Sequence, residues 1–600
     1  MSPKLPTLTA PGRLAIASAP EGLDALLLGR FAKARAPGPL LHVARDDAQM
    51  ARAAEVLAFF APAVEVLTVP AWDCLPYDRV GPHRDILARR IDALTRLIEA
   101  PAAPAGGRVV LTTVNAFLQR VPPRDAFAGR VLAGAVGAQL PLETLTDYFG
   151  RNGYVRVETV GEPGEYALRG GIVDVFPPGE AQPLRLDFFG DELEAIRRFD
   201  PLSQRTTGTT ESFRLEPVNE VILEPETIER FRAGYRSRFG AVTGEDPLYE
   251  AISAGRLHPG MEHWLPLFHE TMETLLDYLP DAAVTLAHQV EAARDARLET
   301  IADYYRARRS IERAAAADGW VYKAIEPEAL YLDAAEWDEL LARNPVACFS
   351  PFAVPEEAGT VFDAGGRRGR DFAEARTSAT TNLYDVVDAH IAAEQAAGRR
   401  VLIAGYSPGT RNRLGALLHE HGLEQPVPVE SWAEARALPA GAVGLITLGL
   451  ETGFATDELS LLTEQDILGE RIARPAARRR RADDFLTEVS ALHEGDFVVH
   501  VDHGIGRYEG LVPLEVGGAP HDCLKVVYAG GDRLFVPVEN IEVLSRFGGE
   551  EATVELDRLG GVNWQARKAR VKQRIREIAG KLIKIAAARA MHESEALEVP

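Results

Sequence analysis

The sequence predicts a multidomain protein of the α/β and α+β classes. Its 600 residues are enough for about four domains of ordinary size. Short apolar runs alternate with segments of helical spacing near the N-terminus. Strand-like runs separated by Pro- and Gly-rich turns follow, and a compact β-rich stretch lies toward the C-terminal end. With 46% hydrophobic and 26% charged residues, the composition is typical of a folded globular protein, not of a disordered or fibrous one.

Charge and cysteine content exclude several functional classes. The formal net charge of −22 argues against a protein that coats nucleic acid with its whole surface. Cys74, Cys348 and Cys523 are far apart, so neither a disulfide scaffold nor a structural zinc site is expected, and a reducing cytoplasm suits them. There is no run of about 18 apolar residues and no unbroken apolar stretch at the N-terminus. We therefore expect neither a membrane span nor a signal peptide.

Catalytic motifs are missing from these residues. The string nearest to the phosphate-binding motif GxxxxGK[ST], at 579–582, has Leu in place of the metal-binding hydroxyl and lies in a helical pattern. No GxSxG, HExxH or EF-hand pattern occurs. His83, His500 and His503 have no companion ligands at suitable spacing. We predict no catalytic residue, no cofactor-binding residue and no metal ligand.

Residues 1–125 are expected to form an α/β layer with a parallel sheet, because strand-like and helical segments alternate there. The strand-like runs are 40–44, 64–69 and 109–114, and the helical ones are 46–60 and 85–97. Trp72 and Tyr77 suit either stacking on DNA bases or closing the core of this module, and we favour the core.

Residues 126–215 are expected to form an antiparallel sheet. Strand-like runs at 154–160, 170–176 and 184–189 are separated by Pro- and Gly-rich turns. In the last run, three apolar residues at alternate positions point to one face, which we predict is buried. Arg185, Asp187 and Phe189 point to the opposite face, a composition that suits either scattered surface residues or a protein interface.

The segments between residues 216 and 487 have three different sequence patterns. Residues 216–375 are largely helical in pattern, and residues 376–475 are expected to form a further α/β domain with strands at 401–404 and 443–447. A basic linker, 476–487, follows. Like charges extend a chain in solvent, so we favour a solvated linker over a segment that contacts phosphates.

The C-terminal part predicts a small β-barrel at 488–550 and a long helix at 560–592. Five short strands are expected in the barrel, with a hairpin turn at 530–532. Pro537 cannot donate a ladder hydrogen bond, so its strand is expected at an edge. The helix is rich in Lys and Arg, which fits a solvated face better than a nucleic-acid contact.

Several stretches resemble one family, the bacterial transcription-repair coupling factors (Mfd), in their N-terminal half. In this sequence they are PAWDCLPYD at 70–78 with PHRDI at 82–86, GEYALRGGIVDVFP at 164–177 with RLDFF at 185–189, FDPLSQRT at 199–206, LTEQDILGER at 462–471 and VHVDHGIGRY at 499–508. They occur in the family's order and extend over most of the chain.

This resemblance implies an architecture. Residues 1–125 and 216–375 would be two parts of a UvrB-like α/β domain with a degenerate nucleotide site, and 126–215 an inserted UvrA-binding β domain. Residues 488–550 would be an RNA polymerase-interacting barrel similar to CarD and Tudor domains, and 560–592 a relay helix. In the family an ATP-dependent double-stranded DNA translocase follows and releases stalled RNA polymerase. The chain thus looks truncated before this motor, for which ATP and Mg²⁺ are implied.

The resemblance also implies partners and residues. UvrA is expected to contact Arg169, Arg185 and Phe189, and we expect Arg185→Glu to abolish this binding without lowering the melting temperature. The RNA polymerase β subunit is expected to add a strand to an exposed edge at 511–516, with Leu511 and Leu514 as contacts. Leu514 is either an apolar anchor for the polymerase or part of the barrel core.

Three functional classes remain. The favoured one is the polymerase-binding, UvrA-recruiting half of a coupling factor, acting as a cytoplasmic monomer. Because the family masks UvrA binding with a C-terminal domain in its resting state, we expect constitutive binding by these residues. A stand-alone adaptor between RNA polymerase and UvrA is the alternative, and a UvrB-type enzyme is disfavoured because the ATP-binding loop is missing.

Overall fold

The computed structural model divides the chain into two compact units, residues 1–473 and 474–600. The described residues are 5–242, 246–314, 322–355, 360–378, 380–423, 426–469, 495, 497–500, 503–516, 519–537, 544–546 and 556. The predicted basic linker at 476–487 and relay helix at 560–592 lie outside them. Among the described residues, no helix combines the length and apolar character needed to cross a membrane.

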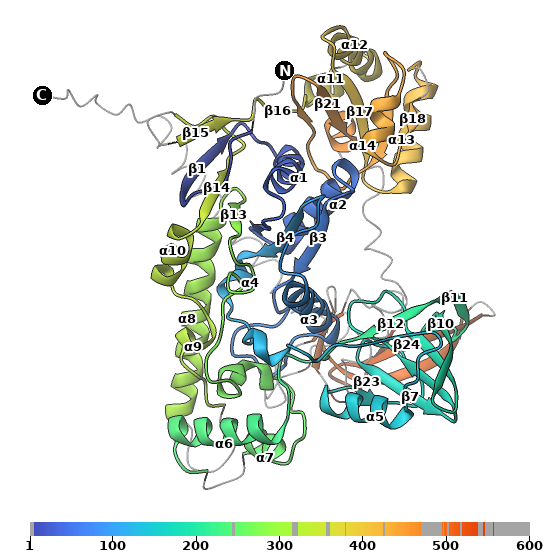
Figure 1. Cartoon of the computed structure of the whole chain (residues 1–600). Helices are drawn as coiled ribbons and strands as arrows, with labels where there is room; N and C mark the ends of the chain where they lie inside the picture. Colours follow the sequence, from blue (N-terminus) through green and yellow to red (C-terminus); the bar gives the residue numbers. More distant parts are fainter. Residues whose placement is uncertain are drawn as a thin grey trace, which may run out of the picture. The chain divides into compact units, whose positions relative to one another are not determined.

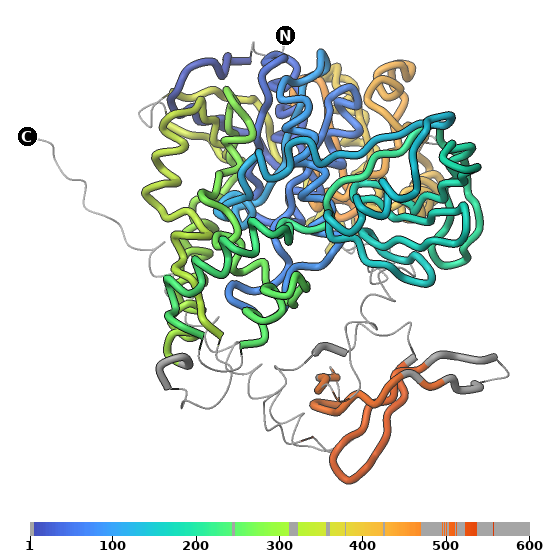
Figure 2. The backbone as a smooth tube through the Cα atoms, turned by 60° about the horizontal axis from the view of Figure 1, so that its bottom comes forward, coloured from blue at the N-terminus to red at the C-terminus, as the bar shows by residue number. Residues whose placement is uncertain are grey.

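A seven-stranded parallel sheet forms the centre of the first unit, with strand order β15-β1-β14-β13-β2-β4-β3 (Figure 1). The strands are β1 (Gly12–Ala17), β2 (Leu40–Ala44), β3 (Glu65–Val69), β4 (Arg108–Thr113), β13 (Ala283–Leu286), β14 (Pro345–Phe349) and β15 (Thr360–Asp363). The three strands expected before residue 125 are confirmed. The segment 216–375, expected to be largely helical, adds β13 to β15, so its green-to-yellow strands run beside the blue ones (Figures 1 and 2).

Helices cover this sheet on both faces and create two apolar cores. Residues of α1 (Leu23–Arg35) and α2 (Asp47–Phe60) belong to one core. The other contains residues of α3 (Arg84–Glu99), α4 (Val114–Leu118), α8 (Val290–Ala314) and α10 (Ala334–Ala342). Side-chain caps fix the helix starts: the Asp46 carboxylate accepts a hydrogen bond from the Gln49 amide at 2.8 Å at the start of α2.

A third core is rich in aromatic side chains. It joins the loop after β3 to α6 (Pro225–Phe239), α7 (Pro247–Ser253), η2 (Met261–Leu267) and α9 (Pro327–Leu330). Trp72 and Tyr77 are both buried in it, and the Tyr77 ring lies 5.6 Å from that of Tyr305. Both residues therefore close a core, as predicted, but this core is built mainly by the segment 216–375 and not by residues 1–125 alone.

A six-stranded sheet occupies the segment expected to be antiparallel, in the order β11-β10-β9-β8-β7-β6. Its strands are β6 (Val155–Arg156), β7 (Glu165–Arg169), β8 (Ile172–Val175), β9 (Leu184–Phe189), β10 (Glu192–Phe199) and β11 (Thr206–Thr210). All pairs are antiparallel except β6 with β7. One face packs on α5 (Leu142–Arg151) and on a two-stranded antiparallel sheet. That small sheet is formed by β5 (Leu132–Ala135) and β12 (Ser212–Leu215). Leu184 and Leu186 are buried there, as their alternation predicted.

The segment 376–475 belongs to an α/β unit, as expected, but this unit begins earlier, at Arg367. It shares one core with the first sheet and has a second core of its own. Its strands are β16 (Arg367–Arg368), β17 (Arg400–Gly405), β18 (Val427–Pro428), β19 (Gly444–Thr447), β20 (Phe454–Ala455) and β21 (Leu459–Thr463), in the order β16-β20-β21-β17-β19-β18. Its helices are α11 (Ala373–Thr377), α12 (Leu383–Ala396), α13 (Pro408–Glu420), α14 (Trp432–Ala437) and α15 (Glu464–Leu468). Phe454 belongs to the core of α1 and α2, and the Trp432 ring lies 5.4 Å from that of Phe60.

The second unit contains a five-stranded antiparallel sheet in the order β25-β24-β23-β22-β26. The strands are β22 (Phe497–His500), β23 (Gly504–Val516), β24 (Ala519–Val527), β25 (Arg533–Pro537) and β26 (Leu544–Arg546). Gly530 and Gly531 have positive φ in the turn predicted at 530–532, and the strand of Pro537 is an edge, as expected. Within the described residues no pairing of β25 with β26 closes the sheet into the expected barrel.

Candidate functional site

The outward face of the six-stranded sheet gathers charged side chains from three neighbouring strands. In the register of β8 and β9, Asp174 stands opposite Arg185, and Ile172 stands opposite Asp187. Arg197 of β10 stands opposite Arg185 on its other side. Because alternate residues of a strand share a face, these side chains form two adjacent rows on the side away from the apolar core.

Asp174 connects two of the residues predicted to bind UvrA. Arg185 donates two hydrogen bonds to its carboxylate, from Nε to Oδ1 at 2.7 Å and from Nη2 to Oδ2 at 2.9 Å. The Nη1 atom of Arg169 lies 3.8 Å from Oδ2 of the same carboxylate. The Asp174 side chain is only 3% exposed, and its hydrogen bonds raise the pKa of Arg185. Arg185 is therefore held by a buried anion, whereas Arg169 lies beside the same carboxylate and donates its hydrogen bond to the Glu158 carbonyl.

Two tight turns place apolar side chains beside this charged group. Gly170 and Gly190 have φ of +62° in the turns that join β7 to β8 and β9 to β10. The turns lie side by side, because the Phe188 amide donates to the Gly171 carbonyl at 2.8 Å, and a Cβ on Gly171 would lie 2.7 Å from the Phe188 oxygen. Next to them Phe189 is 75% exposed, an unusual state for a large apolar side chain.

Two members of this face were not predicted from the sequence. Asp174 and the partly exposed Ile172 were not predicted as site residues, although both lie in the run 170–176. The signal for Asp174 is its place between Val173 and Val175, which are buried on the opposite face. A charged residue between two buried ones in a strand indicates the outward face.

The structure changes the expectation for Arg185→Glu. The introduced carboxylate would face the buried Asp174, with which Arg185 makes its two hydrogen bonds. Loss of the cation leaves a buried charge without its main partner and adds a second negative charge beside it. The expectation of an unchanged melting temperature is therefore replaced by an expected loss of stability.

The strand predicted to bind RNA polymerase, β23, is an edge only over part of its length. It pairs with β22 through residues 504–507 and with β24 through residues 507–516, with a register shift between Tyr508 and Leu511. Leu511 stands opposite Leu524, and Leu514 opposite His521. Within the described residues, the backbone of 511–516 thus has one unpaired edge, in a strand that is internal at its start.

At the start of α1, backbone amides that could bind an anion are hydrogen-bonded to a side chain of the helix itself. This helix follows β1, the arrangement in which nucleotide-binding α/β domains hold a phosphate at the helix N-terminus. Here the Asp24 carboxylate accepts hydrogen bonds from the Gly22 amide at 2.9 Å and the Ala25 amide at 2.7 Å. A Cβ on Gly22 would lie 2.8 Å from the Phe454 ring, so the loop is also covered.

Burial of Asp24 is expected to make the folding stability depend on pH. Burial raises the pKa of its carboxyl from 3.8 to about 7. The folded protein then holds a proton that the unfolded chain releases, so this group's stabilisation is complete below the unfolded pKa and is lost as pH rises through 7. Across that window the loss is about 1.4 kcal/mol per pH unit.

Asp24→Asn keeps an oxygen acceptor but removes the charge. In thermal unfolding between pH 5 and 8, we expect the melting temperature of the variant to exceed that of the unchanged protein by an amount that grows with pH. Burial also raises the pKa values of Glu216 and Glu262 to about 7. Both groups are present in the variant and in the unchanged protein, so the difference in melting temperature reports the contribution of Asp24 alone. A difference that stays constant with pH would contradict this assignment.

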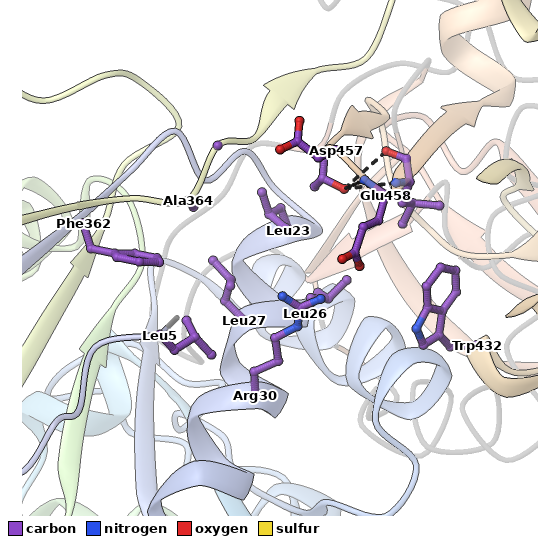
Figure 3. Close-up of a pocket in the computed structure, with 13 residues that line it drawn as sticks. Leu5, Leu23, Leu26, Leu27, Arg30, Phe362, Ala364, Trp432, Asp457 and Glu458 are labelled. Atoms are coloured by element: carbon purple, nitrogen blue, oxygen red, sulfur yellow. Dashed lines mark hydrogen bonds between the residues drawn. The ribbon is translucent and has the colours of Figure 1, made fainter. Parts of the chain in front are cut away.

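A small cavity of about 60 Å³ lies between α1, the end of β15 and the loop before β21 (Figure 3). Leu23, Leu26 and Leu27 line it from α1, and Arg30, Asp457 and Glu458 supply its charged groups. Since one water needs about 10–15 Å³ of such volume, the cavity has room for a few water molecules. In the part of the chain that the structure describes, no cluster of three His, Cys, Asp or Glu residues could hold a metal ion.

Comparison with known families matches three segments of the chain. The family described as UvrB interaction domain matches residues 132–220, which contain the six-stranded sheet and its exposed Phe189. The MFD, D3 domain matches residues 394–467, and the CarD-like/TRCF RID domain matches residues 492–548, which contain β22 to β26. The chain is therefore a multidomain protein of the UvrB-related class that carries a CarD-like module.

Curated relatives identify the family within this class. The chain is 31% identical over 542 residues to the transcription-repair-coupling factor of Rickettsia bellii, 32% over 590 residues to that of Escherichia coli and 31% over 601 residues to that of Mycobacterium bovis. These alignments cover 90%, 96% and 94% of the chain, but 46%, 48% and 47% of the relatives. The chain belongs to the transcription-repair-coupling factor family and spans about half the length of the curated relatives it matches.

Proposed function

We propose that this chain is the partner-binding part of a transcription-repair coupling factor. It binds RNA polymerase stalled at a DNA lesion through its CarD-like module and recruits UvrA through its UvrB interaction domain, so that nucleotide excision repair begins. The matched families and the relatives support this assignment.

The outward face of the six-stranded sheet carries the UvrA part of the proposal. An aromatic side chain that is 75% exposed lies on the same face as two arginines, and exposed aromatic and Arg side chains are the residues most often found as energetic centres of protein interfaces. We assign UvrA binding to Arg169, Arg185 and Phe189.

ATP hydrolysis and DNA translocation are assigned to other residues. We propose that polymerase release, driven by ATP and Mg²⁺ on double-stranded DNA, belongs to the part of the relatives that this chain does not cover. The Asp24 carboxylate at the start of α1 supports this division, because it takes the amides that a bound phosphate would need. In this proposal the chain acts in the cytoplasm as a monomer.

A titration of purified UvrA onto the 600-residue chain tests the proposal. We expect saturable binding with one chain per UvrA subunit, followed by isothermal calorimetry or by fluorescence anisotropy of a labelled chain. A folded chain that forms no complex with UvrA at micromolar concentrations would refute the UvrA part of the proposal.

The polymerase surface gives a separate prediction. The β subunit of RNA polymerase is proposed to pair with the unpaired edge of residues 511–516, and Leu514→Arg is expected to abolish capture of the polymerase in a pull-down. Phe535→Arg, on the opposite edge strand β25, is the matched control and should retain binding. Circular dichroism must show both variants folded, and polymerase binding by folded Leu514→Arg would reject the assignment.

A further inference from the structure

We infer that Asp174 is a positioning residue for partner binding, because it fixes the direction of the Arg185 guanidinium group on the outward face of the six-stranded sheet. This inference rests on the proposed recruitment of UvrA and adds a residue that does not itself need to touch UvrA. Asp174 is 3% exposed, whereas Arg169 and Phe189 are largely open to solvent.

Two contacts fix the Arg185 side chain from different directions. Its edge is bound by the two hydrogen bonds to Asp174, which form the planar, bidentate arrangement that only an arginine can make. Its flat face lies on the buried Phe199 ring, with the guanidinium carbon 4.8 Å from the ring centre. A free arginine side chain samples many rotamers, and here most of that conformational entropy is lost before any partner arrives.

The remaining N–H groups of Arg185 are the part offered to a partner. Asp174 uses the Nε–H and one N–H of Nη2, and within the described residues Nη1 makes no hydrogen bond. The side chain keeps 20% of its surface exposed. Arg185 therefore leaves three N–H groups, two of them on Nη1, in a fixed orientation that fits a carboxylate or carbonyl oxygen of the partner.

The spacing along β9 adds a second requirement for the partner. Phe189 lies four residues after Arg185 on the same face, which corresponds to about 13 Å along the strand. We expect the UvrA surface to place an acceptor oxygen and an apolar pocket at this separation. By holding the Arg185 side chain, the Asp174 carboxylate fixes the distance between the Arg185 donors and the Phe189 ring.

Asp174→Asn tests the inference. The amide is nearly the same size but carries no charge and cannot accept both hydrogen bonds, so we expect the affinity for UvrA to fall by about tenfold or more. In an Arg185→Ala background the same change is expected to alter the affinity by less than about twofold, because Asp174 then has no Arg185 to position.

Stability measurements separate positioning from folding. Arg185→Ala leaves Asp174 buried without its bidentate partner and should lower the melting temperature, while Arg185→Ala with Asp174→Asn should recover part of that loss. UvrA binding should stay weak in both. Arg185→Lys provides a variant that keeps the charge but not the planar fork, and it should also lose about tenfold in affinity.

Asp187→Asn is the matched control. It is the same chemical change on the same face, but Asp187 pairs with Arg197, at 3.2 Å, and not with Arg169 or Arg185. We expect its affinity for UvrA to stay within about twofold of the unchanged chain. If the unchanged chain binds UvrA but Arg185→Lys binds equally well, or if the effects of Asp174→Asn and Arg185→Ala simply add, the positioning role is wrong. No UvrA binding by the unchanged chain would instead overturn the proposed function, and this inference with it.

Discussion

Phe189→Ala is expected to weaken UvrA binding by at least about 30-fold while the melting temperature stays within about 1 °C of the unchanged protein. The side chain is 75% exposed, so its truncation takes almost nothing from the folded core. A buried aromatic anchor at an interface contributes at least about 2 kcal/mol, or roughly 30-fold in affinity. Affinity would be measured by calorimetric titration and stability by thermal unfolding of the same samples.

Phe352→Ala is the matched control for this prediction. Phe352 is 67% exposed, nearly the same as Phe189, but lies in the loop after β14. We expect the control to bind UvrA as the unchanged chain does. Equal binding by Phe189→Ala and the unchanged chain would remove Phe189 from the interface, and equal losses in both variants would point to a general effect of surface apolar area.

Arg185→Glu is expected to lose UvrA binding and also to lower the stability of the β domain. The substitution brings a carboxylate next to the buried Asp174 and removes a guanidinium that packs on Phe199. Breaking a buried ion pair costs about 3–5 kcal/mol, and because Arg185 is one-fifth exposed we place the loss near 3 kcal/mol. Chemical denaturation followed by tyrosine fluorescence and circular dichroism would measure it.

Arg197→Glu distinguishes this effect from charge reversal in general. Arg197 stands opposite Arg185 in the register of β9 and β10, but its side chain is about half exposed and its partner Asp187 is not fully buried. Solvent screens such a pair, so we expect a loss below about 1 kcal/mol. A loss as large as that of Arg185→Glu would show that repulsion across the whole face, and not the buried Asp174, sets the cost.

Local patterns in the sequence were enough to predict part of the candidate UvrA-binding face. The alternation of 184–189 separated Arg185 and Phe189 from the buried leucines, since the side-chain period of a strand is two wherever the strand lies. The role of Arg169 and the two partners came from family resemblance and not from any local pattern. The ion pair of Asp174 with Arg185 was not predicted, because it depends on the register between β8 and β9.

The start of α1 shows the same division. The sequence alone shows that these residues lack the GxxxxGK[ST] pattern, because that pattern is defined by residues at a fixed, short spacing. Asp24 occupies the start of α1, and Phe454, 430 residues further along the chain, covers it. This arrangement depends on how the two α/β segments pack.

The sequence by itself determined the features that neighbouring residues control: the α/β class of the first segment, the antiparallel strands of 126–215 and the turn at 530–532. Only the tertiary structure decided which distant segments share a sheet. Strand β13 is four residues long and buried throughout, so it has no alternation to reveal it, and it pairs with β2 about 240 residues away. Pairings of that kind are set by the packing of the whole unit, because the free energy that holds a short apolar strand in place comes from its neighbours and not from its own sequence.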